Sequence, residues 1–235
     1  MVSMNPGQPL DRPYSVRIRF RKVGQLQYIS HLDLIRTIGR VLARAGAPLW
    51  YSEGYNPRPK MVFALPLSVG VESECEFLDV RLNRAVDCAA LRQNLCRNMT
   101  EDMQVTEVYL PETSFSGIGF ARYDLRIVTA EGNETLAQEL VDTLQLPELP
   151  VMKRGKAGEH EVNIRPLICE ISGKTEGDAI LLSAVLKADS ENYLNPDFLI
   201  RVLRERCGIL RNEPRGEGYS ICRTEVYDRD MSPFR

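Results

Sequence analysis

The first patterned stretch of the chain alternates apolar and charged residues. In the run VRIRFR, residues 16–21, every second side chain is Val, Ile or Phe, and arginines stand between them. Because neighbouring side chains of a strand point to opposite faces, this period of about two predicts a strand with one buried face. Arg17, Arg19 and Arg21 are then expected on the sheet face that helices leave open.

A helical period follows this strand. Apolar residues between Leu34 and Ala45 recur at helical spacing, which predicts a helix with one buried side. The Ser30 hydroxyl can cap the start of this helix, and Asp33 three residues later resembles a short capping box. Gly46 and the proline after it are expected to end the helix.

The rest of the first half completes a recognisable order of elements. Strands are predicted near 61–64 and 77–82, a helix near 87–98 and a further strand near 103–109. Strand, helix, two strands, helix and strand is the ferredoxin-like βαββαβ order. We therefore predict one such domain over residues 14–110.

The second half repeats this order after a loop rich in Ser, Gly and Pro at 110–119. Alternation near 123–127, an apolar helical pattern near 136–144 and strands near 162–172 and 179–186 follow one another. Asn195, Pro196 and Asp197 are typical of a helix start, and Gly208 of its end. A last strand is expected over 219–227. The sequence thus predicts an α+β fold with tandem ferredoxin-like halves and antiparallel sheets, the second domain covering 120–228.

Composition agrees with a globular chain. Hydrophobic residues make up 43% and charged residues 26% of the 235 residues. No stretch approaches the roughly 18 apolar residues that a membrane helix needs, and the first residues lack the apolar core of a signal peptide. We expect a cytoplasmic protein that does not enter a membrane.

Cysteine and histidine usage indicates neither a metal nor a cofactor. The two histidines, His31 and His160, are far apart in sequence, and no two cysteines form a C-x-x-C pair. Free thiols are therefore expected, with no metal site and no cofactor. The six cysteines are Cys75, Cys88, Cys96, Cys169, Cys207 and Cys222.

Charge is unevenly distributed along a chain whose net charge is −2. Residues 14–60 hold nine basic and two acidic side chains, whereas residues 61–119 hold four basic and nine acidic ones. Such a basic region can dock a polyanion or another protein. Within it, Arg36, Arg40 and Arg44 recur every four residues and should form one row on the water-facing side of the helix.

The segment YSEGYNPRPK, residues 51–60, combines stiffness with polar groups. Each proline fixes its own φ angle and restricts the residue before it, so Arg58 and Lys60 are held in place. Ser52, Glu53 and Asn56 lie beside them in sequence. The segment is either a structural connector between strands or a preorganised binding loop.

His31 is the histidine closest to this loop in sequence, and it is the candidate catalytic residue. At the first turn of the helix it could act as a general base or a phosphate ligand. Its helical angle, however, places it toward the apolar side, where a hydrogen-bonded structural histidine is the ordinary finding.

Several runs resemble the radical-SAM-linked protein family, which is bacterial and encoded beside, or fused to, a radical SAM protein. They are residues 16–73, then NIRP and RTEVY. The positions that match are His31, Asp33, Ser52, Glu53, Gly54, Asn56, Pro57, Pro59, Lys60, Pro66, Gly70, Glu76, Asp79, Arg165, Arg223, Thr224 and Glu225.

This resemblance implies association with a radical SAM enzyme and, through genes for ribosomal proteins and ribonuclease G nearby, a role in RNA modification or processing. The chain has no cysteine run for the radical SAM cluster, so we expect it to be a partner of that enzyme. The expected contact residues are Ser52, Glu53, Asn56, Arg58, Lys60, Arg36, Arg40, Arg223 and Glu225.

Three hypotheses stay open at this point. The first is a non-catalytic accessory module that binds RNA or presents a substrate to a separate radical SAM enzyme. The second is a metal-free endoribonuclease of tandem ferredoxin-like type, with His31 and Lys60 as acid and base. The third is a protein-interaction scaffold that binds no RNA.

Overall fold

The computed structural model describes residues 13–129, 132–155, 158–211 and 216–235. The chain divides into two compact units, one up to Phe115 together with Arg235 and the other over Ser116–Phe234. We call them unit 1 and unit 2. The division into domains at residues 14–110 and 120–228 stays a prediction.

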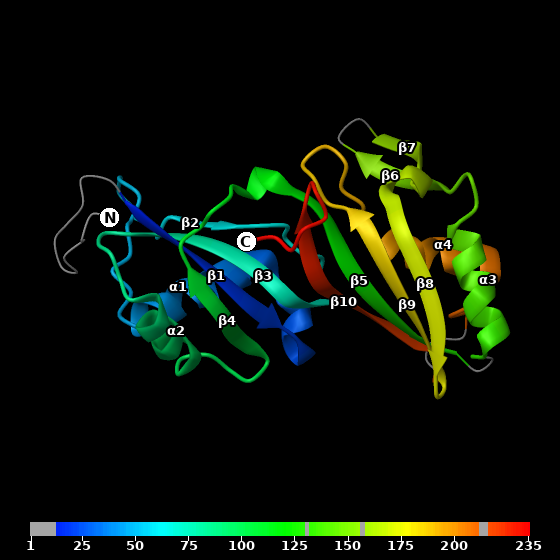
Figure 1. The fold of residues 1–235 in the computed structure, drawn as a ribbon, viewed down its shortest axis with the longest axis horizontal. Coiled ribbons are helices and arrows are strands. Elements are labelled where there is room, and N and C mark those ends of the chain that lie inside the picture. The colour runs from blue at the N-terminus through cyan, green and yellow to red at the C-terminus, as the bar shows by residue number, and fades with distance from the viewer. Residues whose placement is uncertain (1–12, 130–131, 156–157, 212–215) are drawn as a thin grey trace. The chain divides into compact units, whose positions relative to one another are not determined.

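Unit 1 has the predicted order of elements, labelled in Figure 1. They are β1 (Tyr14–Lys22), the 3-10 turn η1 (Gly24–Tyr28), α1 (His31–Arg44), β2 (Met61–Phe63), β3 (Val71–Leu82), α2 (Cys88–Cys96) and β4 (Met103–Tyr109). Strand β1 pairs antiparallel with both β3 and β4, and β2 pairs antiparallel with β3. The strand order β4-β1-β3-β2 is that of a ferredoxin-like sheet.

Helix α1 begins and ends where its sequence predicts. Ser30 accepts a hydrogen bond from the Asp33 backbone N–H at 3.1 Å, and Gly46 after the helix has a φ of 71°. The Ser30 hydroxyl and Arg36 both stabilise the charged form of Asp33 and lower its pKa. Arg36, Arg40 and Arg44 are exposed as a row, which confirms their predicted side of the helix.

The core of unit 1 lies between the sheet and its two helices. It combines the apolar positions of β1 with those of α1, α2, β3 and β4. The members that carry the predicted periods are Val16, Ile18, Phe20, Leu34, Ile38, Val41 and Leu42. The apolar residues that show the strand alternation and those that show the helical spacing therefore pack in one core, as amphipathic elements require.

Unit 2 repeats the plan with one addition. Its elements are β5 (Ile118–Val128), α3 (Glu134–Leu144), β6 (Pro150–Gly155), β7 (Gly158–Asn163), β8 (Ile168–Glu176), β9 (Ala179–Lys187), α4 (Asp197–Cys207) and β10 (Gly218–Asp228). Antiparallel pairings give the order β10-β5-β9-β8, which matches unit 1. The predicted α+β class with ferredoxin-like halves is confirmed.

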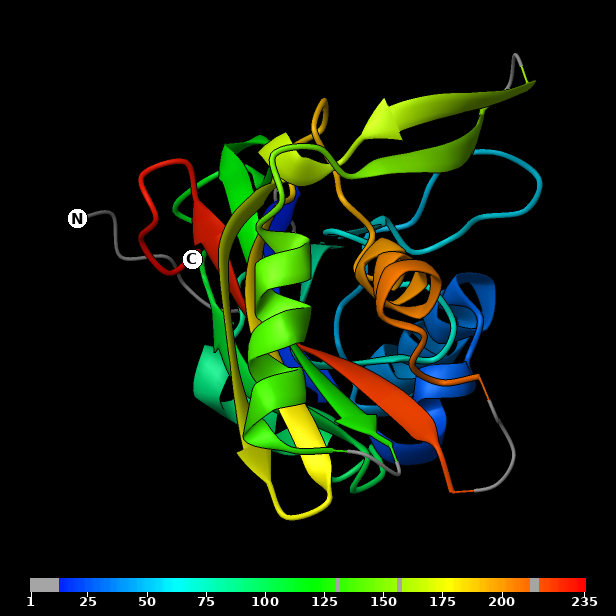
Figure 2. The same ribbon diagram turned by 90° about the vertical axis from the view of Figure 1, so that its right-hand side faces the viewer.

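The addition is the separate hairpin of β6 and β7, which Figure 2 shows extending from its unit beyond α3. Its sequence is charged, and the burial pattern of β7 is exposed at nearly every position. A strand without a buried face has no apolar alternation, so the period that predicts the other strands is missing here. We predicted a strand only from residue 162 onward in this region.

Candidate functional site

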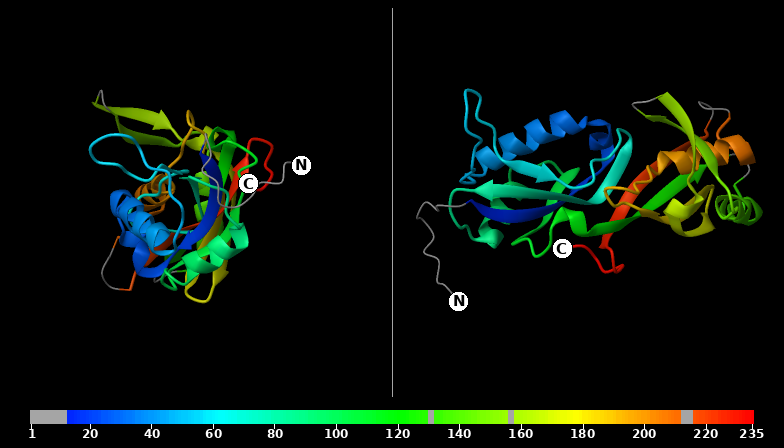
Figure 3. Two further views of the ribbon diagram at one scale, coloured as in Figure 1. Left: turned by 90° about the vertical axis from the view of Figure 1, so that its left-hand side faces the viewer. Right: turned by 90° about the horizontal axis from the view of Figure 1, so that it is seen from above.

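The segment between α1 and β2 forms a short hairpin, seen in Figure 3 as a light-blue loop that stands out from α1. Tyr51 and Pro59 form an antiparallel bridge. The Ser52 N–H donates to the Arg58 carbonyl at 2.8 Å, and the Arg58 N–H donates to the Ser52 hydroxyl at 3.0 Å. The base of this loop is thus fixed by the Tyr51–Pro59 bridge, by the two hydrogen bonds between Ser52 and Arg58, and by the prolines. We call residues 51–60 the basic hairpin.

The basic hairpin is anchored to the sheet through β3. The Trp50 N–H donates to the Arg81 carbonyl at 2.9 Å, and the Arg81 N–H donates to the Lys60 carbonyl at 3.0 Å. The Lys60 N–H in turn donates to the Trp50 carbonyl at 2.9 Å. These bonds continue the β2–β3 pairing into the hairpin, so its cations are attached to a rigid element.

The tip of the basic hairpin is open to water. Glu53, Gly54, Tyr55, Asn56 and the residue after it are exposed, and the Tyr55 side chain is 99% accessible. Gly54 has a φ of 118°, a conformation that only glycine adopts without strain. The turn therefore needs its glycine and presents a tyrosine at its end.

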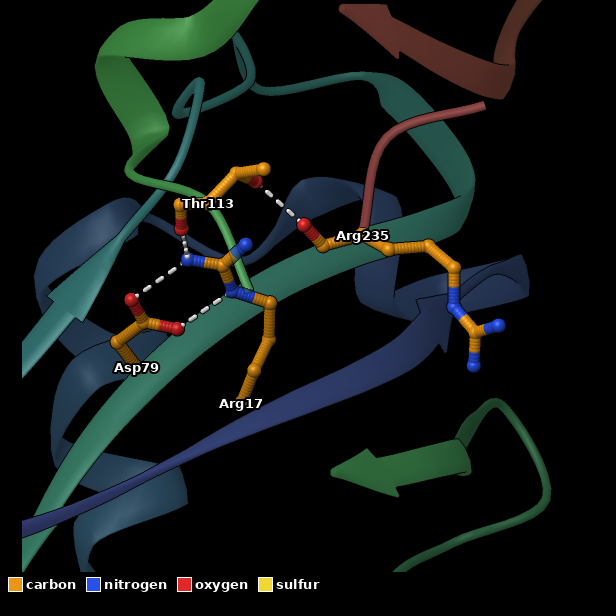
Figure 4. A network of polar contacts seen from close by, with 4 residues as sticks. All are labelled: Arg17, Asp79, Thr113 and Arg235. Atoms are coloured by element: carbon orange, nitrogen blue, oxygen red, sulfur yellow. Dashed lines mark hydrogen bonds and ion pairs between the residues drawn. The ribbon is translucent and has the colours of Figure 1, made fainter. Parts of the chain in front are cut away.

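A buried ion pair lies on the sheet face beside this hairpin. Arg17 on β1 is opposite Asp79 on β3 in the strand register, and its Nε and Nη2 atoms donate to the two carboxylate oxygens at 2.7 and 2.8 Å. Nη2 also donates to the Thr113 carbonyl at 2.8 Å, as Figure 4 shows. The guanidinium stacks over Phe115, with its central carbon 4.3 Å from the ring centroid.

The loop after β4 covers Arg17 completely. Its side chain is 0% exposed, while that of Asp79 is 25% exposed. The Thr113 hydroxyl donates to the Arg235 carbonyl, which fastens this loop to the end of the chain (Figure 4). Arg17 thus lies on the sheet face opposite the helices, as expected, but it is not exposed there, because a carboxylate and a loop enclose it.

The hairpin, β3 and this loop enclose a cavity of about 870 Å³ in unit 1. Its size is within the range of about 300–1,000 Å³ that is typical of small-ligand sites. The lining combines three cations (Arg58, Lys60, Arg81), four hydroxyls (Ser15, Ser52, Thr113, Ser114), one carboxylate (Asp79) and five apolar side chains (Pro59, Met61, Val62, Pro111, Phe115).

The lining of this cavity is electrostatically positive. Arg58, Lys60 and Arg81 line the cavity and are all exposed, so a ligand can reach their charged groups directly. The one carboxylate of the lining, Asp79, is paired with buried Arg17. Pairing with Arg17 reduces the repulsion between this carboxylate and an anion, and its oxygens still offer acceptor lone pairs to a hydroxyl or amino group.

The structure brings some predicted residues together and separates others. Ser52, Arg58 and Lys60 line the cavity, whereas Glu53 and Asn56 lie at the exposed hairpin tip.

Helix α1 carries three further predicted residues on its exposed side. Arg36 makes an exposed ion pair with Asp33 at 3.1 Å, and Arg40 is exposed one turn later. His31, expected toward the apolar side, is exposed, although its ring meets Phe63 edge to face with centroids 5.5 Å apart. Among the described residues, His31 is not part of the cavity lining.

Two predicted contact residues lie in unit 2. Arg223 on β10 is fully buried and lies near the Tyr123 phenol, whose pKa is raised by burial and lowered in part by this arginine. Glu225 is half-buried on the same strand and accepts a hydrogen bond from the Val226 N–H at 3.0 Å. Arg223 is therefore not an exposed cation of the kind that the prediction assumed.

Sequence reasoning missed several members of the site. Arg81 and Thr113 are distant from the hairpin in sequence, and Tyr55 belongs to it but has neither charge nor periodicity to mark it. Asp79 matches a family position, which was a usable signal. Its partner Arg17 could have been found only from the β1–β3 register.

Within the described part of the chain, no three His, Cys, Asp or Glu side chains gather in a group that could bind a metal ion. None of the helices in the described residues has the length and apolar character needed to cross a membrane.

Two solved structures are similar to the chain at low sequence identity. A chain of a Cbf5-Nop10-Gar1 complex is 12% identical over 96% of this chain and 56% of its own length, with a TM-score of 0.48. This chain thus spans little more than half of that one. An unknown protein from Galdieria sulphuraria is 11% identical over 90% of this chain and 99% of its own, with a TM-score of 0.26. Neither likeness carries a functional argument.

No curated protein matches the chain. A family model does match, and it covers residues 15–196, which include the basic hairpin, the Arg17–Asp79 pair and every lining residue of the cavity. The chain is therefore a member of the family described as uncharacterized proteins conserved in bacteria, DUF2344.

Proposed function

We propose that this protein is a non-catalytic accessory module that binds RNA and works with a separate radical SAM enzyme. The observation that carries the RNA part is the cavity of unit 1, which is lined by three exposed cations and by a carboxylate already paired with buried Arg17. Lys and Arg side chains that neutralise phosphates supply the sequence-independent part of nucleic-acid affinity. The radical SAM part is supported by the family resemblance of the sequence.

The geometry of the basic hairpin favours phosphate contact over a purely structural role. A connector between α1 and β2 needs no exposed cations, whereas Arg58 and Lys60 are exposed on a base held by backbone hydrogen bonds. Ser52 and Ser114 hydroxyls in the same lining can donate to phosphate oxygens. Preorganised donors lose little conformational freedom when a ligand arrives.

The exposed row on α1 offers a second place for phosphate contact. Arg40 and Arg44 are exposed on the same helix face as Arg36. Contacts of this kind position a nucleic acid but read no sequence. We therefore propose weak sequence discrimination by this module, with the substrate of the partner enzyme selected elsewhere.

No specific observation favours the endoribonuclease. That hypothesis needs His31 and Lys60 as acid and base. Of these two, only Lys60 lines the cavity among the described residues. The scaffold without RNA binding remains the alternative outcome of the experiment below.

A tagged full-length chain, purified from its native bacterial host, tests the proposal. We expect it to co-purify both with RNA that is not shortened on incubation and with a radical SAM protein. Recovery of the radical SAM protein alone, with no affinity of the purified chain for RNA at low salt, would establish the scaffold instead. RNA cleavage that His31→Ala abolishes while binding persists would establish the endoribonuclease.

A further inference from the structure

The basic hairpin carries an exposed aromatic ring, that of Tyr55, at its tip. Tyr55 is 99% accessible and Tyr51 is 45% accessible, and both are on the hairpin that contributes Arg58 and Lys60 to the cavity. Tyrosine is enriched at interfaces, because its ring is apolar and its hydroxyl can still find a hydrogen-bond partner. The chemistry of the neighbouring side chains indicates which partner.

The ring is close to the cavity along the chain. Tyr55 is three residues from both Ser52 and Arg58, which line the cavity. Three residues span at most about 10 Å when fully extended. A strand whose phosphate lies against Arg58 and Lys60 therefore has a neighbouring nucleotide within reach of the Tyr55 ring.

Hydrogen bonds fix the base of the hairpin, and a glycine turn forms its tip. The base holds the Ser52–Arg58 bonds of 2.8 and 3.0 Å, while the tip turns at Gly54 with a φ of 118°. A tyrosine has only two side-chain torsions to order on binding, so it gives a large stacking surface at low entropic cost.

We infer that the RNA bound by this protein is single-stranded, with one base stacked on Tyr55 and one nucleotide held in the cavity of unit 1. This inference rests on the proposed RNA binding. An aromatic ring gains stacking energy from a base only when that base is unpaired and splayed out. In a duplex the bases are stacked on one another, and only phosphates and groove edges remain for a side chain.

The composition of the cavity fits an unpaired nucleotide. Cations face its phosphate, Pro59, Met61 and Phe115 provide apolar surface for a base or sugar, and the Asp79 carboxylate can accept from a ribose 2′-hydroxyl. The carboxylates of an acidic protein partner would pair with the cations, but they have no hydrogen to donate to the Asp79 carboxylate.

The test measures binding of purified full-length protein to three labelled probes. They are a short single-stranded RNA, the same strand paired with its complement, and the same strand with abasic sites. Wild type should bind the intact single strand more tightly than the duplex. Tyr55→Ala should weaken binding to the intact strand about 5- to 150-fold, the range given by stacking of about 1–3 kcal/mol per base.

Two matched variants separate stacking from other effects. Tyr55→Phe keeps the ring and should bind like wild type, and Tyr28→Ala removes a tyrosine that is 61% accessible but outside the hairpin, also without effect. On the abasic strand Tyr55→Ala should bind like wild type, because no base is present to stack.

Each contrary result has a distinct meaning. Equal binding of single strand and duplex, with Tyr55→Ala unchanged on both, overturns the single-strand inference and leaves RNA binding in place. Absence of binding to every probe overturns both. If, in addition, Tyr55→Ala loses co-purification with a radical SAM protein, the hairpin is a protein-docking surface.

Discussion

Asp79→Ala is expected to lower the free energy of unfolding of unit 1 by about 3–5 kcal/mol, because it leaves a buried charge without its carboxylate. Arg17 is 0% exposed, and both of its bonds to Asp79 are charge-assisted and shorter than 2.9 Å. Trp50, the one tryptophan of the chain, lies beside the hairpin and reports on this unit. Urea unfolding followed by its fluorescence measures the effect.

The control is a carboxylate of the neighbouring strand. Glu107 on β4 pairs with Arg19 at 3.5 Å and with Arg235 at 3.3 Å, and its side chain is 40% exposed. Solvent-exposed pairs contribute about 0–1 kcal/mol, so Glu107→Ala should shift the urea midpoint only slightly. The double variant Arg17→Met/Asp79→Leu should restore most of the stability. Equal shifts for Asp79→Ala and Glu107→Ala would contradict the role assigned to the buried pair.

Removal of the three cavity cations should have the largest effect on RNA affinity. The variant Arg58→Ala/Lys60→Ala/Arg81→Ala loses three phosphate contacts, which for a single strand lowers the salt slope by about 2. At 0.1 M salt this corresponds to roughly a 100-fold weaker affinity. The three side chains are exposed, so unfolding should be nearly unchanged.

A variant of equal charge gives the comparison. Arg84, Arg92 and Arg97 are also exposed and belong to unit 1, but they lie outside the basic hairpin and its cavity. Their simultaneous replacement by alanine changes the net charge by the same amount and should leave the slope almost as in wild type. Titrations at several salt concentrations distinguish the two variants. Equal losses would mean that net charge alone, and no site, governs binding.

Local periods predicted most of the fold, because amphipathic elements show their buried side in the sequence. The run of residues 16–21 predicted β1, and Ser30 with Gly46 marked the limits of α1. The β6–β7 hairpin escaped prediction in part since it buries little on either face. A pattern that depends on burial cannot report an element that stays in water.

The candidate site was predictable only where chemistry and stiffness coincide in one segment. Two prolines beside Arg58 and Lys60 marked the hairpin. The Arg17–Asp79 pair joins residues 62 positions apart, so it depends on strand register rather than on any local period. Tyr55 was missed because the exposure of a loop residue is set by the turn that carries it.

Ultraviolet crosslinking of the purified chain to single-stranded RNA, followed by peptide mapping, most directly tests the central claim that RNA occupies the hairpin and cavity of unit 1. We expect the main crosslinked nucleotide on the peptide that contains residues 51–60, with Tyr55 as the preferred site. The crosslink should weaken as salt is raised and disappear in Arg58→Ala/Lys60→Ala/Arg81→Ala. Wild type without any crosslink, or with crosslinks confined to residues 116–234, would contradict the account.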